Sequence, residues 1–195
     1  AWMGPRGNPH YSAEEIKLDK KQRQLEQKNV DLVILLDVSA SMGVLDTMTR
    51  EPRLKRALDS LDELIKNLDG AYLTLYVFSS ELSKKIPRTF DDLFFRLLAR
   101  EITINENGVP GTDFEKVFQE LAKIEFSSDK TFLLISDGDD TALESLSGSE
   151  KANRMAAIKK AFPHPFIVLG VGSANGGEVP QIAYKGKPVV SKMNI

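Results

Sequence analysis

The stretch Ile34–Gly43, "ILLDVSASMG", decides the fold, because a run of apolar residues ends at an aspartate that two serines follow at steps of two. An extended backbone points alternate side chains to the same side, so Asp37, Ser39 and Ser41 can converge on one point. Nearly continuous apolar runs are typical of strands in a parallel sheet that is covered on both faces. The stretch therefore indicates a buried strand with oxygen-bearing side chains at its carboxyl end.

Four segments of the chain have this apolar character, and helical patterns separate them. The expected strands cover residues 30–37, 71–78, 130–136 and 165–172. The expected helices, with apolar residues at steps of three and four, cover residues 54–68, 114–124 and 152–158. Alternating strands and helices predict an open α/β sheet with helices on both sides, a three-layer, doubly wound, Rossmann-like architecture.

Shorter patterns fill the remaining chain. Residues 84–89 predict an edge strand, where Pro87 is tolerated. Residues 91–100 predict a short helix, and residues 182–192 predict a small C-terminal hairpin that turns at Lys185–Gly186.

Composition excludes several classes of protein. The net charge is −2, and the basic residues form no block with interleaved aromatic residues, so nucleic acid is not an expected partner. The absence of cysteine rules out a disulfide framework and a zinc–thiolate site. Residues 1–29 are Gly/Pro-rich and then densely charged, which predicts an arm or solvated helix before a single domain over residues 30–195.

Three segments place side-chain oxygens where strands end or helices begin. Asp37 and its two serines follow the first strand, Asp137 follows the strand over residues 130–136, and Thr112 precedes a helix. Ligands of open α/β sheets bind at the carboxyl ends of the strands. Hydroxyl and carboxylate oxygens suit a hard cation such as Mg²⁺, whereas zinc and copper are disfavoured because no cysteine is present and both histidines lie elsewhere.

Each segment taken alone also has a structural explanation. The serines could cap a helix, Thr112 reads more readily as a helix N-cap, and "SDGDD" is more often a turn. Asp113 is well placed to cap a helix. Asp139 and Asp140 are more readily explained as solvated acids than as acids that support the metal ligands. The three segments together, in this order on an alternating pattern, favour a metal site.

The motifs "DVSAS", "GTD" and "SDGDD" resemble the metal-ion-dependent adhesion site of von Willebrand factor A domains. The resemblance implies a mostly parallel sheet with one antiparallel edge strand and Mg²⁺ or Mn²⁺ at its top. It implies that Ser39 and Ser41 ligate the metal directly, that Thr112 does so directly or through water, and that Asp37 and Asp137 act mostly through water.

Over about residues 30–194 the chain is similar to bacterial Bat-type proteins of aerotolerance operons, most distinctively in "LGVGSANGGEVP" and "KGKPVVSKMN". Those proteins carry the A domain between membrane-spanning helices. The resemblance implies a domain at the bacterial inner membrane, facing the periplasm, and assembly with other A-domain proteins. Because the closing helix and membrane segments are not in this sequence, we expect the chain to be a soluble fragment that reaches the membrane only through segments outside it.

The expected function is binding rather than catalysis. If one metal position is left to water, an Asp or Glu of a protein partner can displace that water and complete the metal shell. The loop over residues 46–52 is longer than usual for the family, and we expect Met48, Thr49, Arg50 and Glu51 to contribute to partner specificity.

The sequence leaves two alternatives to a metal-dependent binding function open. One is a Mg²⁺-dependent hydrolytic or phosphoryl-transfer enzyme that uses Asp37 or Asp139, although the sequence has no phosphate-binding glycine loop and no histidine near these acids. The other is a scaffold whose metal site is structural or empty.

Overall fold

The computed structural model describes residues 29–46, 50–68, 70–106, 111–127, 129–144, 146–184 and 187–192. Apart from Asn29, the expected N-terminal arm lies outside the described residues. The division into an arm and one domain therefore stays a prediction.

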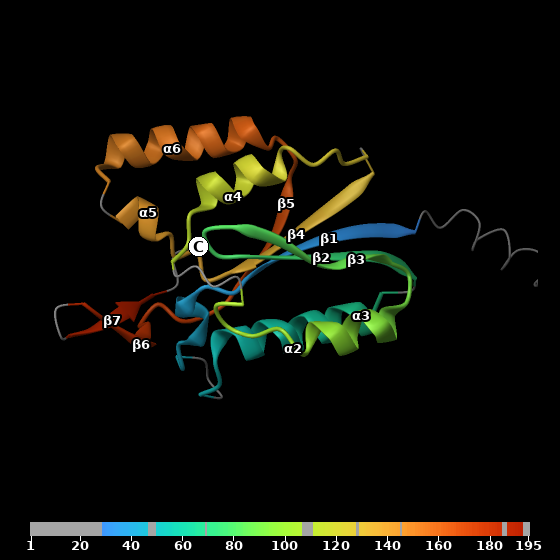
Figure 1. The fold of residues 1–195 in the computed structure, drawn as a ribbon, viewed down its shortest axis with the longest axis horizontal. Coiled ribbons are helices and arrows are strands. Elements are labelled where there is room, and N and C mark those ends of the chain that lie inside the picture. The colour runs from blue at the N-terminus through green and yellow to red at the C-terminus, as the bar shows by residue number, and fades with distance from the viewer. Residues whose placement is uncertain are drawn as a thin grey trace, which may run out of the picture.

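A five-stranded sheet forms the centre of the domain (Figure 1). Its strands are β1 (Val30–Asp37), β2 (Ala71–Phe78), β3 (Leu82–Thr89), β4 (Lys130–Ser136) and β5 (Phe166–Gly170). They lie in the order β3-β2-β1-β4-β5, and only β3 runs antiparallel to its neighbour. The expected mixed sheet with one antiparallel edge strand is thus confirmed, and the edge strand is the one that contains Pro87.

Helices cover both faces of this sheet, which confirms the expected three layers (Figure 1). Helices α2 (Arg53–Lys66) and α3 (Asp92–Ala99) lie on one face, and α4 (Phe114–Leu121) and α6 (Gly148–Ala161) lie on the other. Two short elements that the sequence patterns did not indicate are the 3₁₀ helix η1 (Ala40–Gly43) and the single turn α5 (Thr141–Glu144).

The domain has a hydrophobic core on each face of the sheet, and side chains along β1 alternate between the two cores. Leu32, Ile34 and Leu36 belong to the core shared with α2 and α3, whereas Val33 and Leu35 belong to the core shared with α4 and α6. Because both faces of the central strand are buried, its sequence is a continuous apolar run.

The edge strand β5 differs from the expected burial. Ile167 is 59% exposed and Val168 is 50% exposed, so the expectation that this strand is covered on both faces is wrong for the described residues. The strand ends the strand order and pairs with β4 alone. An apolar run therefore identified the strand correctly but did not establish its burial.

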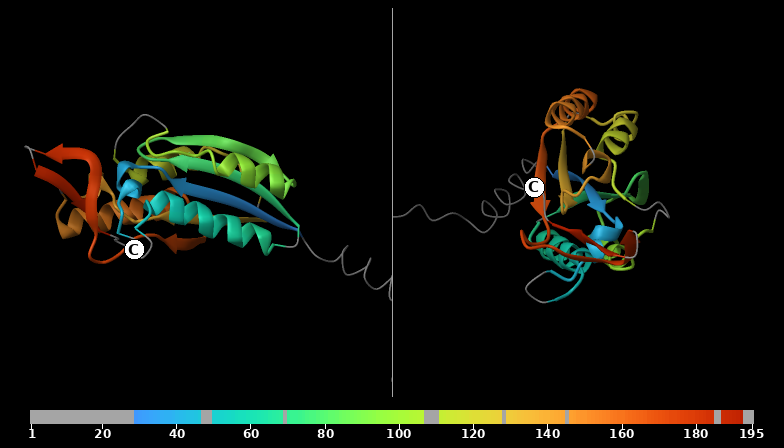
Figure 2. Two further views of the ribbon diagram at one scale, coloured as in Figure 1. Left: turned by 90° about the horizontal axis from the view of Figure 1, so that it is seen from below. Right: turned by 90° about the vertical axis from the view of Figure 1, so that its left-hand side faces the viewer.

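The expected C-terminal hairpin is confirmed as β6 (Gly177–Tyr184) paired antiparallel with β7 (Lys187–Ser191). Its predicted turn at Lys185–Gly186 lies outside the described residues. Figure 2 shows the hairpin projecting beyond the end of the sheet at which β1 ends. Val179 of β6 packs there against Ala40 and Val44, so the hairpin is seated on η1 and the residue that follows it.

Among the described residues, no helix combines the length and apolarity that a membrane crossing requires.

Candidate metal centre

The candidate site lies where the strand order reverses, between the carboxyl ends of β1 and β4. Asp37 is the last residue of β1, and Asp137 directly follows β4. Ser136, the last residue of β4, donates its hydroxyl hydrogen to Asp37 Oδ2 over 2.7 Å. Two of the segments singled out in the sequence therefore meet at the topological switch point, where open α/β sheets bind their ligands.

The segment after β1 folds back on Asp37. The Ser39 amide donates to Asp37 Oδ1 over 2.9 Å, and Ser39 Oγ and Ser41 Oγ lie 3.0 Å apart. The chain then enters η1, which contains Ser41, and the Ser41 hydroxyl also hydrogen-bonds the Asp137 carboxylate. Four of the predicted ligands thus form one buried cluster, with Ser41 its most exposed member at 8%.

Asp137 is held by two groups besides Ser41. The Asp139 amide donates to its Oδ1 over 3.0 Å, and Arg53 Nη1 donates to its Oδ2 over 2.6 Å. Asp137 and Arg53 both have fully buried side chains. The Asp137 carboxylate is therefore fixed in position by charge-assisted hydrogen bonds.

Thr112, the remaining predicted ligand, is buried, and its backbone is hydrogen-bonded to Thr141 in the segment after Asp137. The Thr141 hydroxyl donates to the Thr112 carbonyl over 3.0 Å and accepts from the Thr112 amide over 3.2 Å. Gly111, which precedes it, has a φ of +86°, and a Cβ there would lie 2.8 Å from the Thr141 hydroxyl. This close approach requires glycine at that position.

The neighbouring acids have structural roles. Asp113 accepts from the Lys116 amide over 3.1 Å and caps α4, as the sequence suggested. Asp140 accepts from the amides of Phe114 and Ala142, and it is only 4% exposed. Asp139 is 8% exposed, so the expectation that Asp139 and Asp140 are solvated is wrong; their segment is folded against the start of α4.

The two carboxylates of the site are costly to ionise in the absence of a cation. Burial raises the pKa of Asp37 to about 7, and the Asp137 charge adds to this, while hydrogen bonds from Ser136 and Ser39 oppose it. Burial also raises the pKa of Asp137, against hydrogen bonds from the Asp139 amide and Arg53. Two buried carboxylates, of which Asp137 is paired with Arg53, leave a site that a further cation would stabilise.

The donor set fits a small hard cation. Two neighbouring ligands of an octahedral Mg²⁺, each about 2.1 Å from the ion, lie about 3.0 Å from one another. The Ser39 and Ser41 hydroxyl oxygens have this separation. No group of three or more His, Asp or Glu side chains suited to a metal occurs among the described residues, so a cation here would depend on the hydroxyls.

Sequence reasoning missed Arg53 as part of this site. Its guanidinium also forms a two-bond pair with Asp46, with Nε to Oδ1 at 2.9 Å and Nη2 to Oδ2 at 2.6 Å, and it holds the pKa of Asp46 below its usual value. Arg53 opens an amphipathic helix, where an arginine is ordinarily exposed. The helical pattern of residues 54–68 did not indicate that the arginine before it is buried.

The predicted partner loop is described only in part. Met48 and Thr49 lie outside the described residues. Arg50 is exposed with a φ of +55°, and Glu51 is half-buried. Their role in partner specificity stays a prediction.

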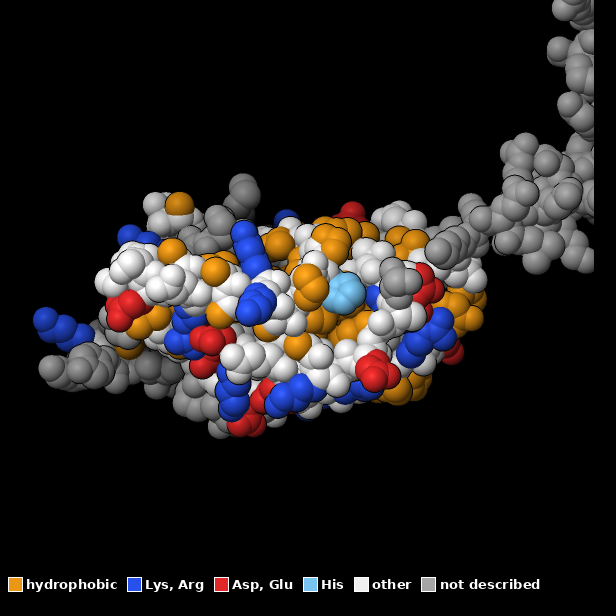
Figure 3. All heavy atoms as spheres, turned by 90° about the horizontal axis from the view of Figure 1, so that it is seen from above, with side chains coloured by type: hydrophobic (Ala, Val, Ile, Leu, Met, Phe, Trp, Pro, Cys, Tyr) orange, Lys and Arg blue, Asp and Glu red, His pale blue; other side chains and the backbone are white. Residues whose placement is uncertain are grey.

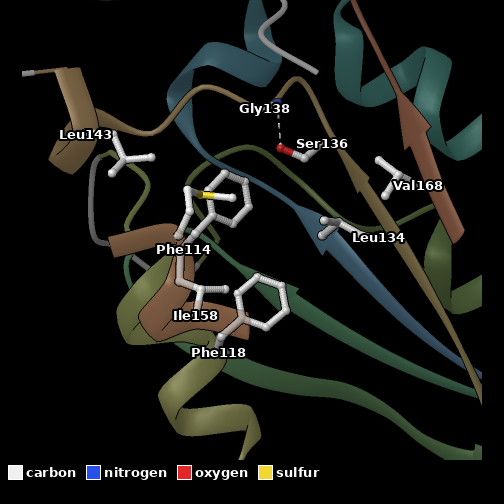
Figure 4. Close-up of a pocket in the computed structure, with 9 residues that line it drawn as sticks. Phe114, Phe118, Leu134, Ser136, Gly138, Leu143, Ile158 and Val168 are labelled. Carbon is white, nitrogen blue, oxygen red and sulfur yellow. Dashed lines mark hydrogen bonds between the residues drawn. The ribbon is translucent and has the colours of Figure 1, made fainter. Parts of the chain in front are cut away.

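An apolar cavity of about 320 Å³ lies beside the site, between α4, α6, β4 and β5 (Figure 4). Phe114, Phe118 and Ile158 line it, and its polar edge is formed by Ser136 and Gly138. The Gly138 amide donates to Ser136 Oγ over 2.9 Å, as the dashed line in Figure 4 marks. Ser136 thus separates the cavity from Asp37, and the apolar lining supplies no ligand to a cation.

Comparisons with known proteins agree with this fold. Residues 32–139 match the family model of the von Willebrand factor type A domain. A search of curated proteins found no match.

Solved structures with the same fold include two from Bacteroides. The chain is 22% identical to the conserved hypothetical protein BatB from Bacteroides thetaiotaomicron, with a TM-score of 0.66 over 85% of this chain and 82% of that chain. It is 21% identical to an aerotolerance-related membrane protein from Bacteroides fragilis, with a TM-score of 0.66 over 85% of this chain and 83% of that chain. The expected likeness to Bat-type proteins is thus confirmed.

A more distant structure is proximal thread matrix protein 1 from the mussel byssus, solved with zinc in its MIDAS motif, the metal-ion-dependent adhesion site. It is 16% identical, with a TM-score of 0.50 over 73% of this chain and 37% of that chain. At such identities these likenesses establish the fold alone. Because the family model covers more than half of the sequence, the chain belongs to the von Willebrand factor type A domain family.

Proposed function

We propose that this domain is a metal-dependent protein-interaction module, in which a Mg²⁺ or Mn²⁺ ion held at the sheet end binds an acidic side chain of a partner protein. The supporting observation is the buried cluster of Asp37, Ser39, Ser41 and Asp137 at the switch point of an A-domain fold. A-domain family members generally mediate interactions between proteins, and this chain has the oxygen donors that such binding needs.

The residues of the site would have two different roles in holding the cation. The hydroxyls of Ser39 and Ser41 would hold the cation directly, with Thr112 as a further ligand, and Asp37 and Asp137 would orient its waters. A divalent cation supplies an exchangeable position at which a partner's carboxylate can bind by charge attraction. Since Arg53 already compensates Asp137, a bound cation retains more positive charge for the incoming carboxylate.

The donor chemistry favours Mg²⁺ or Mn²⁺ over the zinc seen in the mussel structure. All the candidate ligands are oxygens, and zinc prefers nitrogen and sulfur.

Interaction is favoured over catalysis because no histidine lies near the site among the described residues to act as a general acid or base. His164 stacks on Phe132 and Phe162, with ring centroids 5.2 Å and 4.7 Å away. Phe132 lies near the start of β4, at the opposite end of the strand from Asp137.

Nucleic acid is a poor partner on charge grounds. Figure 3 shows one face of the domain, on which Lys and Arg side chains are interspersed with Asp and Glu rather than gathered into a stripe. A continuous basic surface is the usual electrostatic signature of nucleic-acid binding.

We further propose that the full-length protein displays this domain at the bacterial inner membrane, on the periplasmic side, and that other A-domain proteins are among its partners. The likeness to an aerotolerance-related membrane protein supports this placement. An alkaline phosphatase fusion to the domain in the full-length protein should be active, since that reporter requires export. An inactive but expressed fusion would place the domain in the cytoplasm instead.

Calorimetric titration of Mg²⁺ and Mn²⁺ tests the metal site. We expect binding to the wild type and its loss in Asp37→Ala and Ser41→Ala, with circular dichroism to verify that the variants fold. Asp59→Ala, which alters an exposed acid of α2, is the matched control and should bind as the wild type does. A wild type that binds neither cation at millimolar concentration would refute the metal site and favour an inert scaffold.

Capture of partners from an extract with and without EDTA tests the interaction. We expect partners that are lost on chelation and equally lost in Asp37→Ala. Partners retained under both conditions would show that binding does not use the metal.

A further inference from the structure

Arg53 connects the candidate metal centre to the C-terminal hairpin. Its Nη1 donates to Asp137 Oδ2 over 2.6 Å and to Ser191 Oγ over 2.9 Å. Its Nη2 donates to Asp46 Oδ2 over 2.6 Å and to the Ser191 carbonyl over 3.1 Å. One fully buried guanidinium therefore binds a predicted metal ligand and the last residue of β7.

The chain between β5 and β6 is built closely around this arrangement. Gly172 has a φ of +125°, and a Cβ there would lie 2.7 Å from Arg53 Nε. Gly176 has a φ of +68°, and a Cβ there would lie 2.3 Å from the Ser191 carbonyl oxygen. Glycine at these positions lets the backbone close over the guanidinium and over β7.

Asp46 completes the network from the other side. Besides the Arg53 pair, Asp46 Oδ2 accepts from the Ser173 amide over 3.0 Å and from the Ser173 hydroxyl over 3.1 Å. The loop before the hairpin and the loop after η1 are thus joined through the same carboxylate.

The hairpin also rests on the segment that carries Ser41. Val179 of β6 forms a small buried cluster with Ala40 and Val44, and a Cβ on Gly177 would lie 2.6 Å from Val44 Cγ1. If η1 moves on metal binding, it therefore shifts the hairpin through these direct contacts as well as through Arg53.

We propose that Arg53 is a positioning residue that couples cation binding at this centre to docking of the hairpin formed by β6 and β7. The inference rests on the proposed function, since it requires that the centre bind a cation. Docked β7 holds Nη1 against Asp137, so the carboxylate is already oriented when a cation arrives. Because coupling between two sites is reciprocal, a bound cation must in turn stabilise the docked hairpin.

The experiment combines metal affinity with hydrogen exchange of the hairpin amides. In the wild type, Mg²⁺ should slow exchange of the β6 and β7 amides. Ser191→Ala removes one acceptor of Arg53 without touching a predicted ligand, and it should weaken Mn²⁺ binding about two- to tenfold and reduce the metal-dependent protection. Val190→Ala, at the adjacent and 56% exposed position, is the matched control and should leave both readouts unchanged.

Substitutions of Arg53 separate positioning from simple folding. Arg53→Lys keeps a positive charge beside Asp137 but cannot bind Asp137, Asp46 and Ser191 at once, whereas Arg53→Met removes the charge. We expect metal-dependent protection of the hairpin to be lost in both variants, because neither side chain can bind Asp137, Asp46 and Ser191 at once. A folded variant that binds Mn²⁺ and keeps this protection would contradict the positioning role.

The outcomes distinguish the two proposals. If the wild type binds Mn²⁺ but hairpin exchange is the same with and without metal, or if Ser191→Ala binds as the wild type does, the coupling is refuted and the metal site stands. If the wild type binds neither cation, the proposed function fails and the coupling fails with it.

Discussion

Arg53 Nη1 lies 2.6 Å from Asp137 Oδ2, and neither side chain is exposed to solvent. A buried ion pair contributes little net stability compared with apolar side chains of the same size, because both charges lose their hydration. Its value lies in geometry: the guanidinium sets the position of a carboxylate that faces the candidate metal centre. Removing one partner leaves the other charged and unpaired, which is costly.

Replacing Arg53 with methionine should therefore destabilise the metal-free domain by about 3–5 kcal/mol, because Asp137 loses its buried partner. Urea denaturation in EDTA measures the free energy of unfolding. Arg56→Met, an exposed position on the same helix, should cost less than about 1 kcal/mol. Equal effects of the two substitutions would contradict the role given to the buried pair.

Gly172→Ala should lower the free energy of unfolding by about 1–3 kcal/mol, since the added methyl group meets Arg53 and the positive φ is strained for alanine. Gly148→Ala is the matched control, because a Cβ at Gly148 meets nothing within 4 Å and the residue begins α6. The control should be neutral or slightly stabilising. Thermal unfolding of both variants checks the contrast, and a neutral Gly172→Ala would refute the close packing around Arg53.

Phe132→Ala should destabilise the domain by about 3–5 kcal/mol. Phe132 is 1% exposed, and its ring lies 5.0 Å from that of Phe162 and 5.1 Å from that of Phe126, between centroids. Phe94→Ala, at a residue of α3 that is 45% exposed, should cost clearly less. Chemical denaturation of the pair measures the difference, and similar losses would show that the aromatic core contributes no more than surface packing.

Asp62 links α2 to α3 and should make stability depend on pH. It accepts from Arg96 Nε over 2.5 Å and from Lys66 over 2.7 Å, and the Arg96 hydrogen bond is the main reason that the pKa of Asp62 lies below its usual value of 3.8. A depressed pKa means that the stabilisation is present above the unfolded-state value and is lost as the pH falls through the folded-state value. We expect Asp62→Asn to be less stable than the wild type by about 1 kcal/mol or less at pH 6.

Denaturation at about pH 6 and at about pH 3 tests this sign. The gap between the wild type and Asp62→Asn should shrink at the lower pH. Asp59→Asn, whose partner Lys55 is exposed on α2, should show a smaller gap at both values. A gap that widens on acidification would contradict the assignment.

The sequence predicted the parts of this domain that depend on local pattern. The bounds of β1 follow from its apolar run. Asp37, Ser39 and Ser41 converge as expected, but through the 3₁₀ helix η1 rather than through side-chain alternation along an extended strand. Asp137 could be placed nearby because parallel strands bring their carboxyl ends to one edge.

Features set by distant segments could not be predicted in the same way. Arg53 begins an amphipathic helix, and its burial depends on contacts with Asp46, Asp137 and Ser191 of β7. Nothing in the local sequence pattern indicates these contacts. The exposure of Ile167 and Val168 depends on where β5 falls in the strand order rather than on its composition.

The pairing of β1 with β4 also determines when the centre can form during folding. Asp37 and Ser136 are 99 positions apart, and parallel strands so distant in sequence pair slowly because a long loop must close first. During synthesis, a chain that has produced only β1 and β2 has three of the five predicted ligands and still lacks Thr112 and Asp137. Cation binding in the centre should therefore be among the last properties that a newly made domain acquires, and its appearance would mark the completion of the sheet.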